Sequence, residues 1–455
     1  MKTKILATFG PAIEDKYKLA KIIKYADIIR INFSHTNEEQ AEKYISYIKE
    51  TEKLVGKEVS LLADLPGPKI RLSVLKNPII VKKGDVIKLS YEKNKIDKNI
   101  IPVAYKYISD DCKNGMYISI GDGYLKMKVE NIKDDIVTAK VINDGVISSR
   151  KGLNLIGSDI TEQTPTEEDI RIAKFAKDKF DFIALSFVKS DKDIKRLRER
   201  VGNDIFVISK IERKYAIKNI KAISKESDGI MVARGDLAFD IPIESVPTAQ
   251  KKIIKASREA GKPVIVATQM LMSMVNNPMP TRAEVNDVAN SVFEDADCVM
   301  LSDETAMGNY PIESIEMMSK VIHNAEKEIH QNYYPIDTDD IYSYIAHASK
   351  DLSEKHDIKY IFAPTESGAT AIRLSQFRPR SNIIALCENS SVKRKLAIFK
   401  GVRAMNIKNY KSTDEMLDNI KDLALRLKIY KYLVVYGSPK KVGSTDSLKY
   451  ISLLP

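Results

Sequence analysis

Eight short apolar runs, each of strand length and each ending in polar or charged residues, constrain the fold of this chain more than any other feature. Most are followed by a stretch with the apolar spacing of an amphipathic helix. Strands and helices that alternate in this way favour a parallel sheet, and eight repeats are the number that closes a (β/α)8 TIM barrel. We expect strands at residues 5–9, 28–34, 59–65, 182–188, 205–212, 229–236, 264–268 and 298–304. We expect helices at 38–54, 191–200, 246–260, 282–293 and 312–329.

Two of these runs end in charges that suit one kind of chemistry. Lys210 and Glu212 lie two residues apart and therefore project from the same face of a strand, and Asp236 ends the next run. Carboxylate oxygens bind a hard cation and an ammonium neutralises a phosphate, so the three side chains predict a site for phosphate and a divalent metal. A chance Lys–Glu pair on a solvated strand end would explain one run, but not the recurrence of polar strand ends.

The strand–helix repeat is interrupted once and then restarts. Residues 68–150 are β-rich, with strand-like runs at 79–81, 86–91, 116–120, 124–129 and 136–141, and an antiparallel domain at this place can act as a lid. After residue 330, strand-like runs at 360–363, 383–386 and 432–436 alternate with helical stretches. We therefore expect a barrel formed by residues 1–67 and 151–330, a barrel-like β lid domain at 68–150, and a C-terminal α/β domain for regulation or oligomerisation at 331–455.

Composition excludes several other classes of protein. The chain has 455 residues, 3 Cys without a CxxC motif and no apolar run of about 20 residues, which disfavours a disulfide framework, a zinc knuckle and a membrane span. The net charge of +11 is scattered among acidic residues, and there is no Trp, so specific nucleic-acid binding is not indicated. We expect a cytoplasmic protein with reduced thiols.

Ten segments resemble, in order and from end to end, those of the pyruvate kinase family. They are KILATFGP at 4–11, RINFSH at 30–35, DLPGPKIR at 64–71, SRKGLNL at 149–155, DFIALSFV at 181–188, SKIE at 209–212, SDGIMVARGDL at 227–237, GKPVIVATQML at 261–271, PTRAEVNDVAN at 280–290 and ADCVMLSDETA at 296–306. The resemblance implies a glycolytic phosphotransferase that moves the phosphoryl group of phosphoenolpyruvate to ADP, giving pyruvate and ATP. It also implies a need for Mg2+ or Mn2+.

The resemblance assigns roles to residues of this chain. Lys210 would stabilise the transferring phosphoryl group and Arg30 would grip the same phosphate. Gly235 and Thr268 would contact the substrate carboxylate, with Asp236 beside them, and the donor of the proton to the enolate is left open. Taken alone, Thr268 is better explained as a β-branched strand end.

The resemblance also implies sites for metals and for the nucleotide. Glu212 and Asp236 would hold the divalent cation, and Arg71 and Lys151 would contact the nucleotide phosphates. The positions that carry a monovalent cation in the family correspond to Asn32, Ser34, Asp64 and the backbone of Leu65. Asn32 and Ser34 are equally explained as turn formers.

Lys69 departs from the family pattern. Members that need K+ carry a glutamate at this position, and a fixed ammonium here would supply the charge that K+ otherwise contributes. We therefore expect activity that does not require K+. The alternative is that Lys69 points to solvent and the cation still binds.

The loop Thr365, Ser367, Gly368 and Thr370 precedes a helical stretch in the C-terminal domain, and a helix start with free hydroxyls favours an anion. Residues 443–445 are expected to close the same pocket. The family places effectors of phosphorylated type in this region and usually forms homotetramers. An ordinary capped helix is the other explanation for this loop.

Two other functions stay open at this point. One is another metal-dependent barrel enzyme for phosphoenolpyruvate or an enolate, such as an aldolase or a lyase, which would lack ADP dependence. The other is a non-catalytic sugar-phosphate sensor or a basic nucleic-acid binder.

Overall fold

A computed structural model of the chain describes residues 1–91, 100–121, 125–158, 160–328, 340–437 and 444–453. Its central part is a closed barrel of eight parallel strands in the order β1-β16-β15-β14-β13-β12-β3-β2. The barrel strands are β1 (Lys4–Thr8), β2 (Ile28–Asn32), β3 (Ser60–Asp64), β12 (Phe182–Leu185), β13 (Val207–Ile211), β14 (Gly229–Ala233), β15 (Val264–Ala267) and β16 (Cys298–Leu301). The fold class predicted from the sequence is therefore confirmed.

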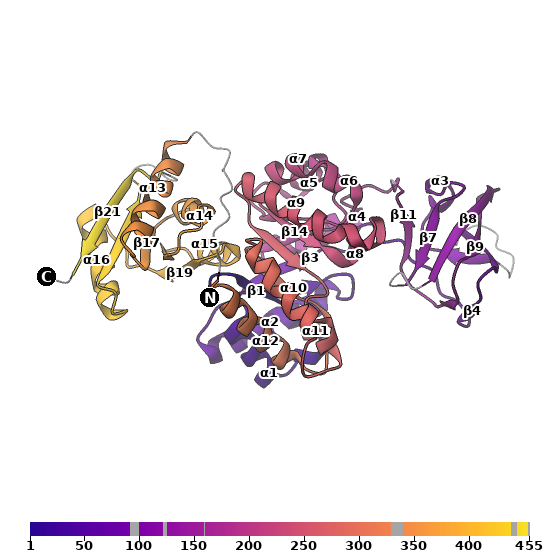
Figure 1. Cartoon of the computed structure of the whole chain (residues 1–455), viewed down its shortest axis with the longest axis horizontal. Coiled ribbons are helices and arrows are strands. Elements are labelled where there is room, and N and C mark those ends of the chain that lie inside the picture. Colours follow the sequence, from indigo (N-terminus) through magenta and orange to yellow (C-terminus); the bar gives the residue numbers. More distant parts are fainter. Residues whose placement is uncertain (92–99, 122–124, 159, 329–339, 438–443, 454–455) are drawn as a thin grey trace.

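Helices cover the outside of the barrel (Figure 1). They are α1 (Lys16–Tyr25), α2 (Glu38–Val55), α4 (Glu167–Ala176), α5 (Asp191–Val201), α6 (Lys214–Lys218), α7 (Ile220–Glu226), α8 (Arg234–Asp240), α9 (Val246–Glu259), α10 (Arg282–Phe293), α11 (Asp303–Ala306) and α12 (Pro311–Ala325). Local sequence explains where several begin. Ser190 and Thr281 form capping boxes before α5 and α10, and Pro311 occupies the first turn of α12.

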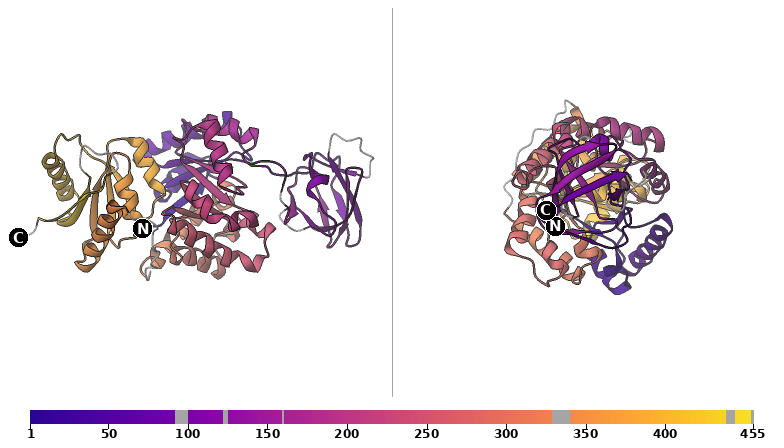
Figure 2. Two further views of the ribbon diagram at one scale, coloured as in Figure 1. Left: turned by 90° about the horizontal axis from the view of Figure 1, so that it is seen from above. Right: turned by 90° about the vertical axis from the view of Figure 1, so that its right-hand side faces the viewer.

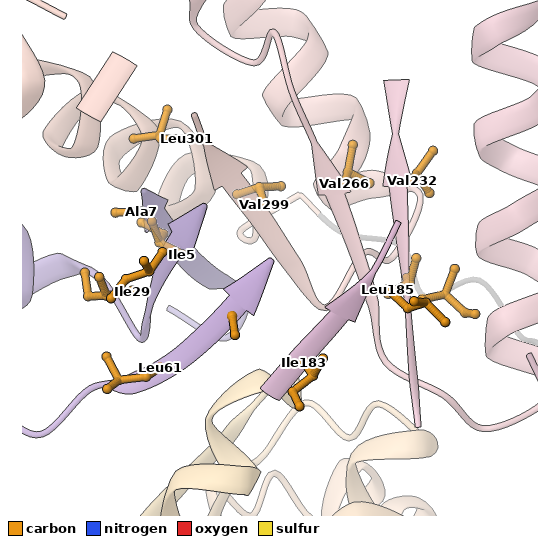
Figure 3. Packing of buried hydrophobic residues seen from close by; sticks show 14 of the residues in the cluster. Ile5, Ala7, Ile29, Leu61, Ile183, Leu185, Val232, Val266, Val299 and Leu301 are labelled. Carbon is orange, nitrogen blue, oxygen red and sulfur yellow. The ribbon is translucent and has the colours of Figure 1, made fainter. Parts of the chain in front are cut away.

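The alternation of side chains along each strand divides the core into two layers. Ile5 and Ala7 of β1 point outward into the layer beneath the helices, together with residues such as Leu61, Val232 and Val299 (Figure 3). Leu6, between them in the sequence, points into the barrel with the other inward-facing residues. Because successive residues of a strand face opposite sides, the apolar runs fill both layers at once.

The lid is a β-rich part inserted between β3 and β12. A six-stranded sheet has the order β11-β7-β8-β9-β5-β6, and a two-stranded sheet pairs β10 with β4. The strands are β4 (Ile79–Val81), β5 (Val86–Tyr91), β6 (Ile100–Val103), β7 (Tyr117–Ile120), β8 (Leu125–Lys133), β9 (Ile136–Val141), β10 (Gly145–Ile147) and β11 (Leu153–Ile156), with a short helix α3 (Ile108–Asp111). Figure 2 shows the lid at one end of the long axis, joined to the barrel by two stretches of chain.

The C-terminal domain lies at the opposite end of the barrel (Figures 1 and 2). Its sheet has the order β19-β18-β17-β20-β21, parallel except for the last strand. Its elements are α13 (Ile341–Lys355), β17 (Tyr360–Pro364), α14 (Ala369–Gln376), β18 (Asn382–Cys387), α15 (Ser390–Lys395), β19 (Val402–Asn406), α16 (Thr413–Arg426), β20 (Lys431–Tyr436) and β21 (Ser447–Ser452). One hydrophobic cluster joins the barrel interior to this domain, and Phe206 packs edge-on against both Phe182 and Phe399 at the junction.

Other features of the described residues agree with the sequence. No described helix is long and apolar enough to cross a membrane. The thiols of Cys112, Cys298 and Cys387 are free and buried in different parts of the chain. The predicted domain limits stay a prediction, and the predicted helix end at residue 329 lies outside the described residues.

Candidate active site at the barrel mouth

In several barrel strands the inward-facing side chains change from apolar to polar toward the carboxyl end of the strand. In β1, β2, β3 and β13 the inward residues Leu6, Ile28, Leu62 and Ile208 are apolar and fully buried, and the next inward residue is polar. In a parallel barrel all these ends meet at one mouth. The inward polar residues gathered there are Thr8, Arg30, Asp64, Ser186, Lys210 and Glu212.

Lys210 is the centre of this polar layer. Its ammonium lies 2.9 Å from Glu212 Oε1 and 3.0 Å from Asp64 Oδ1, and it donates a hydrogen bond of 2.7 Å to Ser186 Oγ. Burial acts to lower the pKa of Lys210, but Asp64 and Glu212 outweigh it and raise the pKa above its usual value. Lys210 is therefore a buried cation at the base of the mouth.

Asp64 joins this cation to a second one. Arg30 Nε donates to Asp64 Oδ2 at 2.7 Å and its Nη2 lies 2.7 Å from the same oxygen, while its Nη1 donates to Thr8 Oγ1 at 3.0 Å. Burial would raise the pKa of Asp64, but Lys210 and Arg30 together hold it below its usual range. One buried carboxylate thus fixes two cations, and both point toward the mouth.

Glu212 and Asp236 are the two carboxylates predicted to hold a divalent metal. Glu212 is almost fully buried, and its Oε2 accepts a hydrogen bond of 2.6 Å from the Phe187 amide. Its Oε1 has no hydrogen bond of good geometry among the described residues, although it lies near Lys210. Burial raises the pKa of Glu212, and the charge of Asp236 adds to the rise while Lys210 opposes it. A bound cation would relieve both effects.

A dedicated cage of protein ligands is absent from the described part of the chain, where no three His, Cys, Asp or Glu side chains are grouped to hold a metal. Mg2+ and similar ions are commonly held by one or two carboxylates, with substrate oxygens and water as the other ligands. Glu212, with its spare buried oxygen, and Asp236, in the first turn of α8, fit such a site.

Gly235 and Thr268 meet where β14 and β15 end. The Gly235 amide donates to Thr268 Oγ1 at 2.8 Å, and a Cβ at Gly235 would lie 3.3 Å from that oxygen. Thr268 has a φ of 69°, which is rare and strained for a β-branched residue. Arg234 supports this backbone by donating to Thr268 O at 2.7 Å, and its guanidinium is held by an ion pair of 2.6 Å with Asp287.

The residues predicted for a monovalent cation come from adjacent strand ends. Asn32 and Asp64 are register partners of β2 and β3, and Ser34 donates its amide to Asn32 Oδ1 at 3.1 Å. The carbonyl of Leu65 accepts a hydrogen bond of 2.6 Å from Ser186 Oγ. Lys69 has an exposed side chain on the loop after β3.

The charge of Lys69 nevertheless acts at the mouth. Burial lowers the pKa of His35, and Arg71, Lys69 and Arg30 lower it further. His35 follows Ser34 directly, so the ammonium of Lys69 contributes positive potential beside the residues predicted for the monovalent cation.

Arg71 and Lys151 lie side by side where the chain enters and leaves the lid. Arg71 forms an isolated bridge with Gly152 and donates to Arg150 O at 3.3 Å, and Leu72 donates its amide to Lys151 O at 2.9 Å. Neither side chain has a described contact with the Lys210 cluster. The predicted nucleotide residues are therefore close to each other but stand apart from the polar layer in the barrel.

The predicted effector loop precedes α14. Gly368, with a φ of 90°, caps the helix, and its amide donates to Thr365 Oγ1 at 3.0 Å. Thr370 is buried and shares a hydrogen bond of 3.0 Å with Thr445, whereas Ser367 is exposed. Gly443, expected to close the same pocket, lies outside the described residues.

Sequence reasoning missed two members of the polar layer and understated a third. Ser186 holds Lys210 and Thr8 holds Arg30, and neither was predicted. Asp64 was predicted only for the monovalent site, yet it bridges the two buried cations. All three are polar inward residues at strand ends, so the rule that identified Lys210 would have found them had it been applied to every strand.

This fold and this mouth define a class of protein: a barrel enzyme that handles an anionic substrate with the help of a divalent metal. Comparison with known proteins narrows the class. The sequence matches the family profile described as "Pyruvate kinase, barrel domain" over residues 1–315 and that of "Pyruvate kinase, alpha/beta domain" over 343–451. The chain belongs to the pyruvate kinase family, which consists of phosphotransferases whose activity depends on a divalent metal.

Individual relatives match nearly the whole of this chain. A pyruvate kinase of Bacillus licheniformis is 38% identical and is matched over 98% of this chain and 80% of its own length. A pyruvate kinase of Thermotoga maritima is 36% identical over 99% of both chains. A solved pyruvate kinase structure from Cryptosporidium parvum has a TM-score of 0.92 at 33% identity, covering 99% of this chain and 96% of its own.

Proposed function

We propose that the chain transfers the phosphoryl group of phosphoenolpyruvate to ADP, with the residues of the barrel mouth in the roles described below. The observation that carries this proposal is the pair of buried cations, Lys210 and Arg30, both fixed by Asp64. Phosphoryl transfer requires mainly positioning and neutralisation of charge, and little covalent work by protein groups. In the reaction the bond from phosphorus to the enol oxygen breaks, a bond to the terminal phosphate oxygen of ADP forms, and the enolate takes up a proton to become pyruvate.

Lys210 and Arg30 would bind the phosphoryl group while it moves. Their hydrogen bonds to Asp64, Ser186 and Thr8 hold them in place before substrate arrives. Donors fixed in advance inside a water-poor site stabilise developing negative charge more effectively than donors that must reorient. The guanidinium of Arg30 can offer two parallel donors to a phosphate, and the ammonium of Lys210 acts as a point charge.

The end that carries the substrate carboxylate would lie against Gly235 and Thr268. With no Cβ at Gly235, an anion can approach the backbone at the start of α8. The hydroxyl of Thr268 accepts from Gly235 and donates to Ala267 O at 2.6 Å, so its position is tightly fixed.

We propose Mg2+ or Mn2+ as the divalent metal, held by Glu212 and Asp236. When bound, such an ion polarises substrate oxygens and neutralises their charge. The chain's own contribution is the buried Glu212, oriented by the Phe187 amide, and the neighbouring carboxylate of Asp236. Chelation by EDTA is expected to abolish activity, and added Mg2+ or Mn2+ to restore it.

Activity is proposed not to require K+. The fixed charge of Lys69 supports this proposal because it already acts at His35, next to the residues predicted for the cation. The test replaces all K+ and Na+ by tetramethylammonium, where undiminished turnover is expected. Lys69→Glu should create dependence on K+, whereas Lys76→Glu, on the exposed surface of the lid, should not. Collapse of the parent activity without K+ would refute the proposal.

Arg71 and Lys151 are proposed to bind the phosphates of ADP when the lid approaches the mouth. Their shared place at the base of the lid supports this role. The loop from Thr365 to Thr370 is proposed to bind a phosphorylated effector, with Ser367 and backbone amides as donors. Addition of sugar phosphates or AMP that leaves the substrate-saturation curve unchanged would remove support for that role.

A homotetramer and a cytoplasmic location are also proposed. Light scattering of the purified chain tests the first and cell fractionation tests the second.

The decisive experiment for the reaction is an assay of pyruvate formation in which phosphoenolpyruvate, ADP and metal are varied independently. Pyruvate is expected only when all three are present, with ATP formed in equal amount. Pyruvate formation without ADP would instead favour a lyase or aldolase, and no turnover under any condition would favour a sensor. These outcomes separate the three functions without reference to any single side chain.

A further inference from the structure

A buried ion pair between Arg213 and Asp240 lies beside the two carboxylates proposed for the divalent metal, and it takes no direct part in the proposed chemistry. Arg213 Nη1 lies 3.8 Å from Asp240 Oδ1, and the two residues are 9% and 6% exposed. Arg213 follows Glu212 directly, just past the end of β13. Asp240 is the last residue of α8, whose first turn holds Asp236. The pair thus joins the two elements that carry the metal carboxylates.

Asp240 also holds the chain where it leaves the lid. Its Oδ1 accepts a hydrogen bond of 3.1 Å from the amide of Gly157, the residue that follows β11, the last strand of the lid. Its Oδ2 accepts a hydrogen bond of 2.7 Å from the amide of Lys214 at the start of α6. One buried carboxylate therefore ties the exit of the lid to α8 and to the segment that carries Arg213.

Arg213 connects this carboxylate to Phe187. Its guanidinium lies 5.0 Å from the centre of the Phe187 ring, within the range of a cation–π contact. The amide of Phe187 in turn donates to Glu212 Oε2 at 2.6 Å, and this bond orients the buried metal carboxylate. Phe187 has a φ of 56°, which is unfavourable for a bulky residue and persists only where neighbouring groups hold it. The guanidinium against the ring is one such group, and Thr164, whose hydroxyl donates to Phe187 O at 3.2 Å, is another.

The same ring meets the chain where it enters the lid. Gly67 has a φ of 67°, and a Cβ at this position would lie 2.6 Å from Phe187 Cδ2, so the backbone at the lid entry packs directly against the ring. Two stretches of chain join the lid to the barrel (Figure 2). One of them contacts Phe187 and the other is bonded to Asp240, with Arg213 between the two. The position of the lid and the orientation of Glu212 are thus linked through three buried side chains.

We propose that Arg213 and Asp240 are positioning residues that couple the attachment of the lid to the divalent-metal site. Arg213 acts on Glu212 through Phe187, and Asp240 fixes both Arg213 and the lid exit. Partners that orient metal ligands commonly contribute about ten- to a hundredfold to metal affinity. Because coupling between two sites is reciprocal, a metal that fixes Glu212 also holds the lid exit more firmly. This inference rests on the proposed metal site, and it adds the residues that set the affinity of that site and link it to the lid.

The first test measures binding of Mn2+ to the full chain by electron paramagnetic resonance, with no substrate present. Arg213→Met keeps the stem of the side chain but removes the guanidinium, and it should weaken Mn2+ binding about tenfold. Arg213→Met combined with Asp240→Asn should weaken binding by a similar factor, and it removes both charges, so neither is left buried without its partner. The matched control is Lys214→Met, which removes the same charge from the next residue, whose side chain is exposed. This control should bind Mn2+ within twofold of the parent.

The second test follows hydrogen–deuterium exchange at the amide of Gly157, in the parent and in Arg213→Met. Mn2+ should slow this exchange severalfold in the parent and leave it unchanged in Arg213→Met. An ion pair that only stabilised the fold would not transmit the effect of the metal to the lid exit. In turnover assays, Arg213→Met should raise the Mg2+ concentration for the half-maximal rate about tenfold, while kcat at saturating Mg2+ should change little.

Three results would overturn the proposal. One is Mn2+ affinity within twofold of the parent in both the single and the double variant, or an equal loss of affinity in Lys214→Met. Another is exchange at Gly157 of the parent that does not respond to Mn2+, a measurement that does not depend on whether any variant folds. The third is a parent chain that does not bind Mn2+. Failure of the proposed reaction is seen separately, because a parent that binds Mn2+ but forms no pyruvate would remove the phosphoryl transfer and leave the coupling intact.

Discussion

Replacement of Asp64 by asparagine is the most informative single perturbation of the polar layer. The substitution keeps the shape of the side chain but removes the negative charge that lies 3.0 Å from Lys210 and 2.7 Å from Arg30. Unit charges 3.0 Å apart interact by about 5 kcal/mol at an effective dielectric constant near 20. Asparagine and water recover part of this energy, so we expect the free energy of unfolding to fall by about 3–5 kcal/mol, as for other broken buried pairs.

The pH dependence of this loss follows from the direction of each pKa. The pKa of Asp64 is lowered in the folded state, so its contribution is present above the unfolded value of about 4 and is lost as pH falls further. The pKa of Lys210 is raised, so its contribution is present below about pH 10 and is lost at higher pH. The difference between parent and Asp64→Asn should therefore be flat from about pH 5 to 9 and shrink below about pH 4.

Urea unfolding at several pH values measures this difference, and pH profiles of kcat accompany it. Without Asp64 the pKa of Lys210 falls, so the alkaline limb of the profile should move to lower pH. Asp191→Asn is a suitable control, because it breaks an exposed pair with Lys195 that should contribute less than about 1 kcal/mol. An Asp64→Asn protein with parental stability and an unmoved alkaline limb would refute the role given to Asp64.

Three further predictions concern other contacts. Gly235→Ala should leave stability nearly unchanged but lower kcat/KM for phosphoenolpyruvate about ten- to a hundredfold, because the new methyl group displaces Thr268 or the substrate; unchanged kinetics would contradict this. Ser186→Ala removes a hydrogen bond to Lys210 and should lower kcat more than it changes KM, as steady-state kinetics would measure. Asp295→Asn should cost about 3–5 kcal/mol in urea unfolding. This difference in the free energy of unfolding should persist at pH 4, because Arg378, Lys400 and Arg258 outweigh burial and hold the pKa of Asp295 well below its usual range. Equal stability of parent and variant at pH 4 would contradict this.

The barrel was predictable because its strands and helices carry clear periodicities. Residues 282–293 were predicted as a helix and form α10 with those bounds. The predicted ends of the strands were less accurate than the predicted bounds of this helix, because the prediction included polar residues that lie beyond the last hydrogen bond of the sheet. The predicted strand at 298–304 ends at Leu301, and Asp303 begins the short helix α11 instead. Strand β21 was missed because none of its residues is buried and its sequence shows no strict alternation of apolar and polar residues.

The candidate site was predictable to the extent that it follows the rule of polar strand ends. Lys210 and Glu212 share a face, and the structure brings them within 2.9 Å of each other. The partners that fix Lys210 come from other strands, and a single sequence does not say which strand end faces which. The positive φ of Thr268 and the pairing of Arg378 with Asp295 across 83 residues arise only from the folded arrangement.

The most direct test of the proposed chemistry is turnover by Lys210→Met. Methionine keeps the length and packing of the stem but removes the ammonium, while Asp64 stays paired with Arg30. The kcat for pyruvate formation should fall about a hundred- to a thousandfold, while circular dichroism shows that the variant is folded. The control Lys225→Met, at an exposed position, should keep parental turnover. A folded Lys210→Met protein that retains turnover within tenfold of the parent would contradict a phosphoryl-stabilising role for Lys210.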